Sequence, residues 1–161
     1  MVYTRDAGHT EGLAYAARSH SFPAPMTLLE QATHLQTLAH SPDILVAIDT
    51  YYADDVAVVE GAGEPFTGRE TQKGRVVDFM ANLKAMHGES TWTLAAHETA
   101  PGTGVVFIET SDDMEFQDGT RTRLDEVAVQ RWEGGKVVHE RFYTIVPAAA
   151  PAAAPAAAPA A

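Results

Sequence analysis

Apolar residues recur at helical spacing in three segments of the first half of the chain. The first segment follows Thr27, which with Glu30 three positions later resembles a capping box. The motif Ser41-Pro42-Asp43 ends this segment and starts a second one through residues 44–48. The third segment runs from residue 69 to a glycine at position 88, which is expected to end the helix. The pattern therefore predicts three helices before residue 89.

Beyond residue 88 the apolar period changes to two, which is typical of strands. Four such stretches cover residues 90–99, 102–116, 120–132 and 136–146, with glycine-containing turns between the last three. A shorter apolar stretch at residues 56–60 predicts one more strand between the second and third helices. Helices followed by an antiparallel meander indicate an α+β domain with the helices on one face of the sheet. We expect the antiparallel sheet to curve into a conical shape and, with the helices, to enclose a pocket.

Three regions differ in composition along the 161 residues. Residues 147–161 contain four prolines at a strict spacing of four, which predicts an extended low-complexity tail that could link the domain to a partner. Residues 1–25 show neither a secretory signal nor a sustained apolar period, and are expected to form a loosely ordered arm. The folded domain is therefore expected at residues 26–146.

Charge and residue content exclude several classes of function. A net charge of −11 opposes binding to nucleic acid or to an anionic membrane surface, and no apolar run is long enough to span a membrane. The absence of cysteine excludes disulfides, thiolate nucleophiles and iron–sulfur clusters. The seven histidines form no metal-binding motif and there is no glycine-rich phosphate loop, so neither a metal nor a cofactor is expected. Without a targeting signal, a cytoplasmic location is expected.

An acidic residue ends the first predicted strand. Glu60 follows an apolar run and, by the alternation of strand side chains, shares a face with Val58. It is either a proton-transfer group at the mouth of an apolar cavity or a strand-end acid paired with Lys73 or Arg69.

A second acid and two histidines are further candidates. Glu140 shares a face with Val138 and Phe142 in the last predicted strand. If it points inward it needs a partner, for which arginine or histidine is the expected type, because burying a lone charge is costly. A structural ion pair and a catalytic role both stay open for it. His34 in the first helix and His97 in an apolar strand are each either pocket residues or surface residues.

Three stretches carry a specific resemblance: YYADDVAVVEG, the closely following FTGRETQKG, and DEVAVQRWEGGKVVHERFY. They resemble the SnoaL-like branch of the nuclear transport factor two fold, which includes ketosteroid isomerase, polyketide cyclases and limonene epoxide hydrolase. The resemblance covers about residues 27–144 and implies a conical, strongly bent sheet with three helices along a deep apolar pocket. It also implies a homodimer formed through the sheet face. The fold hosts many functions, so it does not by itself assign one.

The resemblance assigns roles to individual positions. The general base of ketosteroid isomerase corresponds to Glu60. The tyrosine of its oxyanion hole falls at Gln36, with His34 within alignment error. Its protonated aspartate falls at Val127, with Asp125 two residues away on the same face. The chain therefore keeps the candidate base and lacks the recognised oxyanion donors, which argues against a steroid isomerase.

Two functions stay open at this level. In the first, the domain binds a small, largely apolar ligand in an enclosed pocket and performs cofactor-independent acid–base chemistry of the isomerase, cyclase or hydrolase type. Glu60 is then the base, and its polar partner is one of three residues: His34, Gln36 or Glu140. The pocket lining draws on Gln36 and five more residues: Tyr52, His97, Val127, Trp132 and Phe142. In the second, the domain is a non-catalytic ligand-binding or dimerisation module, Glu60 is structural and the aromatic residues are core.

Overall fold

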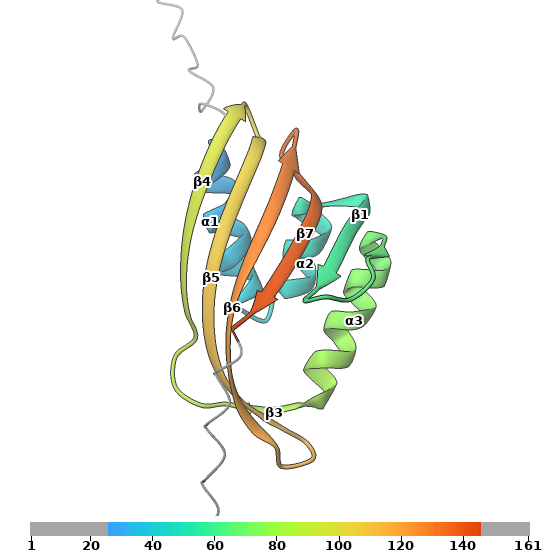
Figure 1. Cartoon of the computed structure of the whole chain (residues 1–161), viewed down its shortest axis with the longest axis vertical. Helices are drawn as coiled ribbons and strands as arrows, with labels where there is room; N and C mark the ends of the chain where they lie inside the picture. The colour runs from blue at the N-terminus through green and yellow to red at the C-terminus, as the bar shows by residue number, and fades with distance from the viewer. Residues whose placement is uncertain (1–25, 146–161) are drawn as a thin grey trace, which may run out of the picture.

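The computed structural model describes residues 26–145. The arm predicted for residues 1–25 and the tail predicted for residues 147–161 lie outside the described residues. Three helices, α1 (Leu28–Ala39), α2 (Ile44–Tyr51) and α3 (Arg69–Asn82), lie on one side of a curved sheet (Figure 1). The strands are β1 (Tyr52–Glu60), β2 (Phe66–Thr67), β3 (Leu83–Met86), β4 (Thr91–Ala100), β5 (Thr103–Phe116), β6 (Arg121–Glu133) and β7 (Lys136–Thr144). The predicted α+β class is confirmed.

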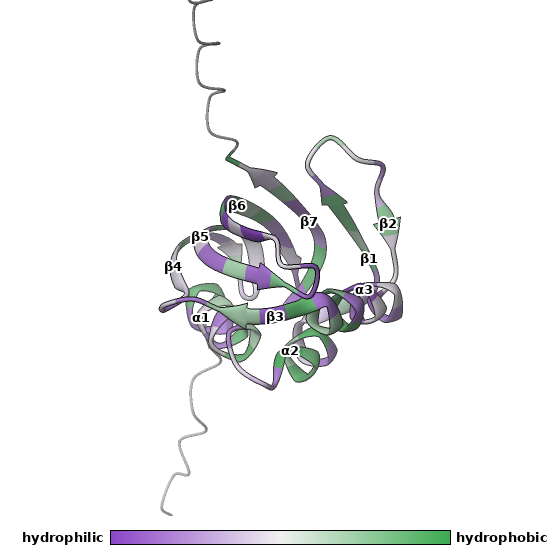
Figure 2. Cartoon of the chain, turned by 90° about the horizontal axis from the view of Figure 1, so that it is seen from below, coloured by the Kyte–Doolittle hydropathy of each residue, from purple (hydrophilic) through white to green (hydrophobic). Residues whose placement is uncertain are grey.

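The seven strands follow the order β2-β1-β7-β6-β5-β3, and β4 also pairs with β5. Strands β4 to β7 form the antiparallel meander that the sequence predicts. Strand β1 pairs with β7 in parallel, so the sheet is mixed and not wholly antiparallel as expected. A parallel pair needs a long connection between its strands, and the passage through α3 and the meander supplies one. The sheet curls into a half-barrel around the helices (Figures 1 and 2).

The third helix ends at Asn82, earlier than predicted, because the residues after it join the sheet. Leu83–Met86 form β3, whose side chains alternate between half-buried and exposed, and this strand pairs with the Met114–Phe116 end of β5. Leu83 and Met86 fit a helical period as well as a strand, so only the tertiary pairing decides between the two.

The predicted capping box at the start of α1 is confirmed. The N–H of Thr27 donates to the Glu30 carboxylate at 2.7 Å, and the N–H of Glu30 donates to Oγ1 of Thr27 at 3.3 Å. The helix then buries Leu28, Ala32 and Leu35 against the sheet. The core therefore lies between the helices and the concave side of the curved sheet.

Strand side chains alternate between two faces of this sheet. The inner face, which the helices cover, carries Glu60 on β1, Glu140 and Phe142 on β7, Glu126, Ala128, Gln130 and Trp132 on β6, and Ile108, Thr110 and Asp112 on β5. The outer face carries Phe107 and Glu109 on β5, Val127, Val129 and Arg131 on β6, and His139, Arg141 and Tyr143 on β7.

Candidate functional site

A chain of buried hydrogen bonds converges on Glu140 at the inner face. The hydroxyl of Tyr52 donates to Oε2 of Glu140 at 2.7 Å, and Nε2 of Gln130 donates to Oε1 at 2.7 Å. The indole N–H of Trp132 donates to Oε1 of Gln130 at 3.0 Å. Glu140 is only 2 % exposed and the other three residues are also buried. This buried network therefore gives each carboxylate oxygen of Glu140 a hydrogen-bond donor.

Strand register brings the members of the network together. Gln130 and Glu140 are directly paired across β6 and β7, and Trp132 lies two residues further along β6 on the same face. Tyr52 enters from the first residue of β1. Because the Trp132 indole can only donate, it fixes the orientation of the Gln130 amide so that the NH₂ group points at Glu140.

The partners of Glu140 differ in type from the arginine or histidine expected from the sequence. They are a hydroxyl and an amide, and both are neutral. Burial raises the pKa of Glu140, while the hydrogen bonds from Gln130 and Tyr52 lower it by less. Burial also raises the pKa of the Tyr52 hydroxyl well above its ordinary value, and the neighbouring Glu140 adds to that effect.

A further carboxyl on the inner face titrates near neutral pH. Glu126 lies on β6, four residues before Gln130 and opposite Thr110 of β5, and its side chain is half-buried. Burial, and after it the charges of Asp112, Glu140 and Glu60, together raise its pKa to about 7. Glu126 can therefore both hold and release a proton under physiological conditions.

Sequence reasoning missed Glu126 because it followed the resemblance to position 127. Val127 and Asp125 point to the outer face, where Asp125 is bonded to Ser111 and Arg123. The alternation of side chains along the strand DEVAVQRW could have identified Glu126 as an inner-face residue. It places Glu126 on the same face as Trp132, a large aromatic residue that is expected to be buried.

Glu60 lies at the end of β1 on the inner face, directly opposite Phe142 of β7. Its side chain is 58 % exposed, and Nη2 of Arg75 on α3 lies 2.5 Å from Oε1. The two cations that the sequence suggested as its partners pair elsewhere: Lys73 with Asp49, and Arg69 with Asp54. Glu60 is thus an exposed, ion-paired neighbour of Glu126.

The remaining sequence-derived candidates fall into three places. Gln36 is buried in α1 and Phe142 is half-buried against the core. His34 is exposed on α1, with Nδ1 2.6 Å from the hydroxyl of Tyr51. His97 and Val127 lie on the outer face. Of the candidates, the structure brings Tyr52, Trp132 and Glu140 into one network and leaves these five outside it.

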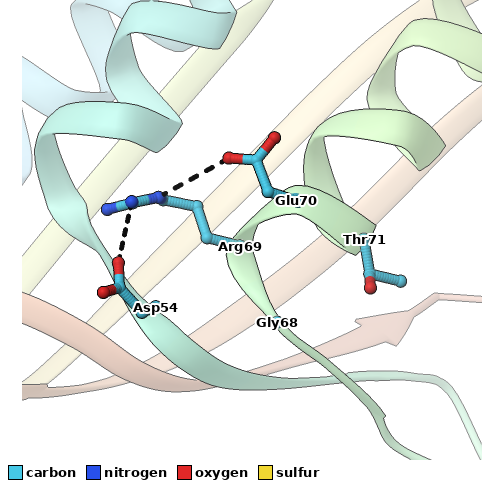
Figure 3. Close-up of a pocket in the computed structure, with 5 residues that line it drawn as sticks. All are labelled: Asp54, Gly68, Arg69, Glu70 and Thr71. Carbon is cyan, nitrogen blue, oxygen red and sulfur yellow. Dashed lines mark ion pairs between the residues drawn. The ribbon is translucent and has the colours of Figure 1, made fainter.

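Two shallow recesses lie away from the inner face. Figure 3 shows the first, at the start of α3, where Nη2 of Arg69 lies 2.7 Å from Asp54 and Nε lies 4.0 Å from Glu70. Arg69 therefore already lies between two acidic partners in this recess. The second recess is lined largely by outer-face residues of β4, β5 and β6, among them Thr93, Glu109 and Asp125.

Within residues 26–145, no three histidine, aspartate or glutamate side chains gather as a metal site would require. The same part of the chain has no helix that is both long and apolar enough to cross a membrane.

The fold is that of a small α+β domain in which a curved sheet carries several carboxyl groups on its inner face. The model of the SnoaL-like domain matches residues 26–144, and the chain belongs to this family. No curated protein matches the chain.

Several solved structures share the fold. A protein from Mesorhizobium loti, described as a candidate SnoaL-like polyketide cyclase, is 24 % identical with a TM-score of 0.59, over 73 % of this chain and 99 % of that one. A ketosteroid isomerase-like protein from Erwinia carotovora atroseptica is 14 % identical with a TM-score of 0.61. The match covers 78 % of this chain and 100 % of that one. A third structure is a hypothetical protein from Catenulispora acidiphila with a ketosteroid isomerase-like fold, in complex with trimethylamine. It is 22 % identical with a TM-score of 0.56, and the match covers 73 % of this chain and 86 % of that one. At these identities the likeness shows the fold alone.

Proposed function

We propose that the protein binds a small, largely apolar molecule against the inner face of its sheet and moves a proton there without a cofactor. The reaction is of the isomerase, cyclase or hydrolase type, and Glu126 is the acid–base group. The observation that carries this proposal is the half-buried Glu126, whose pKa is about 7, on the same face as the buried network. Family membership and the polyketide cyclase and isomerase names among the structural neighbours support it.

The chemistry follows from the two protonation states of Glu126. In its neutral form the carboxyl donates a hydrogen bond to a carbonyl oxygen of the ligand, and in its ionised form it accepts a proton from the adjacent carbon. The network around Glu140 is closed and buried, so it supports the position of β6 and β7 and does not itself exchange protons with the ligand. Ala128, between Glu126 and Gln130 on this face, is buried in the core and places apolar packing beside the carboxyl.

Glu60, the base suggested by the resemblance, is the competing acid–base group on this face. In the present proposal its role is electrostatic. Burial is the largest cause of the raised pKa of Glu126, and the charges of Asp112 and Glu140 come next. The charge of Glu60 is a further, smaller cause. Its own carboxylate is engaged by Arg75. The two residues can therefore be distinguished by substituting each in turn.

The test uses 2-decalone, a neutral and apolar ketone, as probe. We expect the protein to accelerate exchange of the decalone α-hydrogens in D₂O, followed by NMR, and Glu126→Gln to abolish the acceleration. Glu60→Gln should retain it and should lower the pKa of Glu126 in a ¹³C carboxyl titration. The proposal is overturned if Glu126→Gln exchanges as fast as the wild type, or if Glu126 titrates at its ordinary value of 4.5.

A second candidate function, dimerisation through the sheet, is favoured by the outer face. The helices lie behind the sheet and leave this face uncovered (Figure 1). Phe107 is 48 % exposed at its centre and pairs with Val129 across β5 and β6. Glu109 and Arg131 place opposite charges on either side of these apolar residues, which suits a self-complementary contact between two copies.

The oligomeric state tests this second candidate. We expect light scattering to report a dimer for the wild type and a monomer for Phe107→Asp. Leu29→Asp, at an equally exposed apolar position on α1, should leave the dimer intact. A monomeric wild type, or a dimer that survives Phe107→Asp, contradicts the outer-face interface.

A further inference from the structure

We propose that the hydroxyl of Thr110 donates a hydrogen bond to the carbonyl oxygen of the ligand while Glu126 removes a proton from the adjacent carbon. This inference rests on the proposed function, because it assigns the second group that the same reaction requires.

The chemistry at Glu126 calls for a separate hydrogen-bond donor. When the ionised carboxylate accepts a proton from the carbon, the C–H electron pair forms a carbon–carbon double bond and the carbonyl π pair moves onto the oxygen. The negative charge that develops there must be stabilised for the step to be fast. An ionised carboxylate is only an acceptor, so Glu126 cannot donate to the oxygen in the same step. A second residue therefore has to supply that hydrogen bond.

Strand register places Thr110 directly beside Glu126. The two residues are paired across β5 and β6, and both lie on the inner face. Directly opposed residues on one face of an antiparallel pair have Cβ atoms about 4.5–5.5 Å apart. A carbonyl oxygen that accepts from Thr110 therefore places its neighbouring carbon within reach of the Glu126 carboxylate.

The Thr110 hydroxyl is available, whereas other hydroxyls near the inner face are engaged. The hydroxyl of Tyr52 donates to Glu140. The hydroxyl of Ser90 donates to Asp112, which lies two residues beyond Thr110 on β5. Within residues 26–145 the Thr110 hydroxyl has no hydrogen-bond partner and is not among the fully buried unpaired atoms, so solvent reaches it.

The pair lies at the boundary between solvent and the core. Further along β6 on the inner face, Ala128 and Gln130 are buried. The inner-face residues around Glu126 are each half-buried: Thr110, Asp112, Leu124 and Phe142. A ligand at this boundary therefore meets Thr110 and Glu126 without displacing the core.

The charges around the pair make a neutral donor necessary. Asp112, Glu60 and Glu140 are acids on the same face, and the guanidinium of Arg75 on α3 lies 2.5 Å from Glu60 and offsets its charge. A hydroxyl stabilises a negative oxygen without adding a charge of its own. Its hydrogen bond strengthens as the oxygen becomes ionised, so it favours the transition state over the bound ketone.

Thr144 is the competing donor, because it is paired with Glu126 on the other side, across β6 and β7. It is exposed at the last residue of β7, whereas Thr110 is half-buried and paired with Trp92 of β4. The Trp92 ring stacks on His40 with centroids 6.2 Å apart, which shelters this side of the row. A hydrogen bond is stronger where water is excluded, so Thr110 is the donor and Thr144 the matched control.

Exchange of the 2-decalone α-hydrogens in D₂O tests the role of Thr110. Thr110→Val keeps the shape of the side chain and removes the hydroxyl, and we expect it to lower kcat by at least about tenfold with little change in KM. Thr110→Ser restores the hydroxyl and should recover most of the rate. Thr144→Val should exchange as the wild type does. An unchanged kcat in Thr110→Val overturns the inference.

The carbonyl carbon of bound 2-decalone gives a readout that needs no catalysis. With ¹³C at this carbon, and above the titration of Glu126, we expect the wild type, Thr110→Ser and Thr144→Val to shift its NMR signal downfield of that in Thr110→Val. This order follows because a hydrogen bond draws electron density from a carbonyl group. The same signal position in the wild type and Thr110→Val overturns the inference.

The two readouts separate this inference from the proposed function. If exchange depends on Glu126 and the carbonyl signal does not depend on Thr110, the donor is wrong and the acid–base site stands. If the carbonyl signal depends on Thr110 and exchange is absent, the hydrogen bond stands and the catalytic role of Glu126 fails. A wild type that neither binds nor exchanges 2-decalone overturns both.

Discussion

At the scale of single residues, burial decides what each acid on the inner face can do. Glu60 and Glu126 share this face, and neither carboxylate is bonded to backbone. Glu60 reaches solvent and Arg75, whereas Glu126 is half-buried among other acids and its pKa rises to about 7. Glu140 is fully buried and is held by two neutral donors. The same residue type thus yields an ion pair, a titrating group and a structural acceptor.

Substitution of Glu126 is expected to change the pH dependence of stability. Because its pKa is raised from 4.5 to about 7, the folded protein keeps a proton that the unfolded chain has already released. This group therefore costs stability progressively as the pH rises through that window. Glu126→Gln should gain stability relative to the wild type between acidic and neutral pH, as measured by urea unfolding at several pH values. A difference that does not vary with pH contradicts the raised pKa, and Glu109→Gln serves as the outer-face control.

Removal of the Tyr52 hydroxyl is expected to destabilise the protein. Tyr52→Phe leaves Oε2 of the buried Glu140 without its donor, at a cost of about 1–3 kcal/mol in the free energy of unfolding. Tyr143→Phe removes an exposed hydroxyl on the outer face and should change stability by less than about 0.5 kcal/mol. Urea denaturation of both variants provides the measurement. Equal stability of the two would mean that the network adds nothing at Tyr52.

At the scale of elements, local pattern and strand pairing agree in most places and conflict at α3. The capping box fixes the start of α1, and Gly134-Gly135 joins β6 to β7 with both residues at positive φ. After Asn82 the apolar spacing would allow the helix to continue, and pairing with β5 turns the chain into β3 instead. The start of α1 is therefore set by local chemistry, whereas the end of α3 is set by the pairing of the next residues with the sheet.

Two glycines in different elements should respond oppositely to alanine. A Cβ at Gly104, near the start of β5, would overlap the carbonyl oxygen of His97 and crowd Leu28, so Gly104→Ala should cost about 1–3 kcal/mol. Gly74, in α3, has open space around its Cα, and Gly74→Ala should stabilise the helix by about 0.5–1 kcal/mol. Thermal and urea unfolding check both. A neutral Gly104→Ala would contradict the close approach of β4 and β5.

At the scale of the whole molecule, the curved sheet gives the two faces different roles. The inner face holds the core, the buried network and Glu126, while the outer face offers exposed Phe107 between opposite charges. The parallel pairing of β1 with β7 brings Glu60 next to Phe142, which no antiparallel meander alone would do. Ligand chemistry and association can therefore be altered independently by substitutions on opposite faces.

A shortened chain of residues 26–146 is expected to fold as the full chain does. The described residues contain a hydrophobic core and the seven-stranded sheet on which it packs. The free energy of unfolding of this fragment should match that of the 161-residue chain within the roughly 10–15 % uncertainty of a urea extrapolation. Loss of a cooperative transition in the fragment would show that residues 1–25 or 147–161 contribute to the fold.

The sequence by itself determined the features that depend on neighbours along the chain. The capping box of α1, the four-stranded meander and the shared face of Glu140 and Phe142 follow from spacings of two to four residues. Only the tertiary structure decided the end of α3, the parallel place of β1, and which acid is half-buried. It also supplied Tyr52 as the partner of Glu140 across 88 residues of chain. Burial and long-range pairing depend on which surfaces meet in space, and a residue's neighbours in sequence do not specify that.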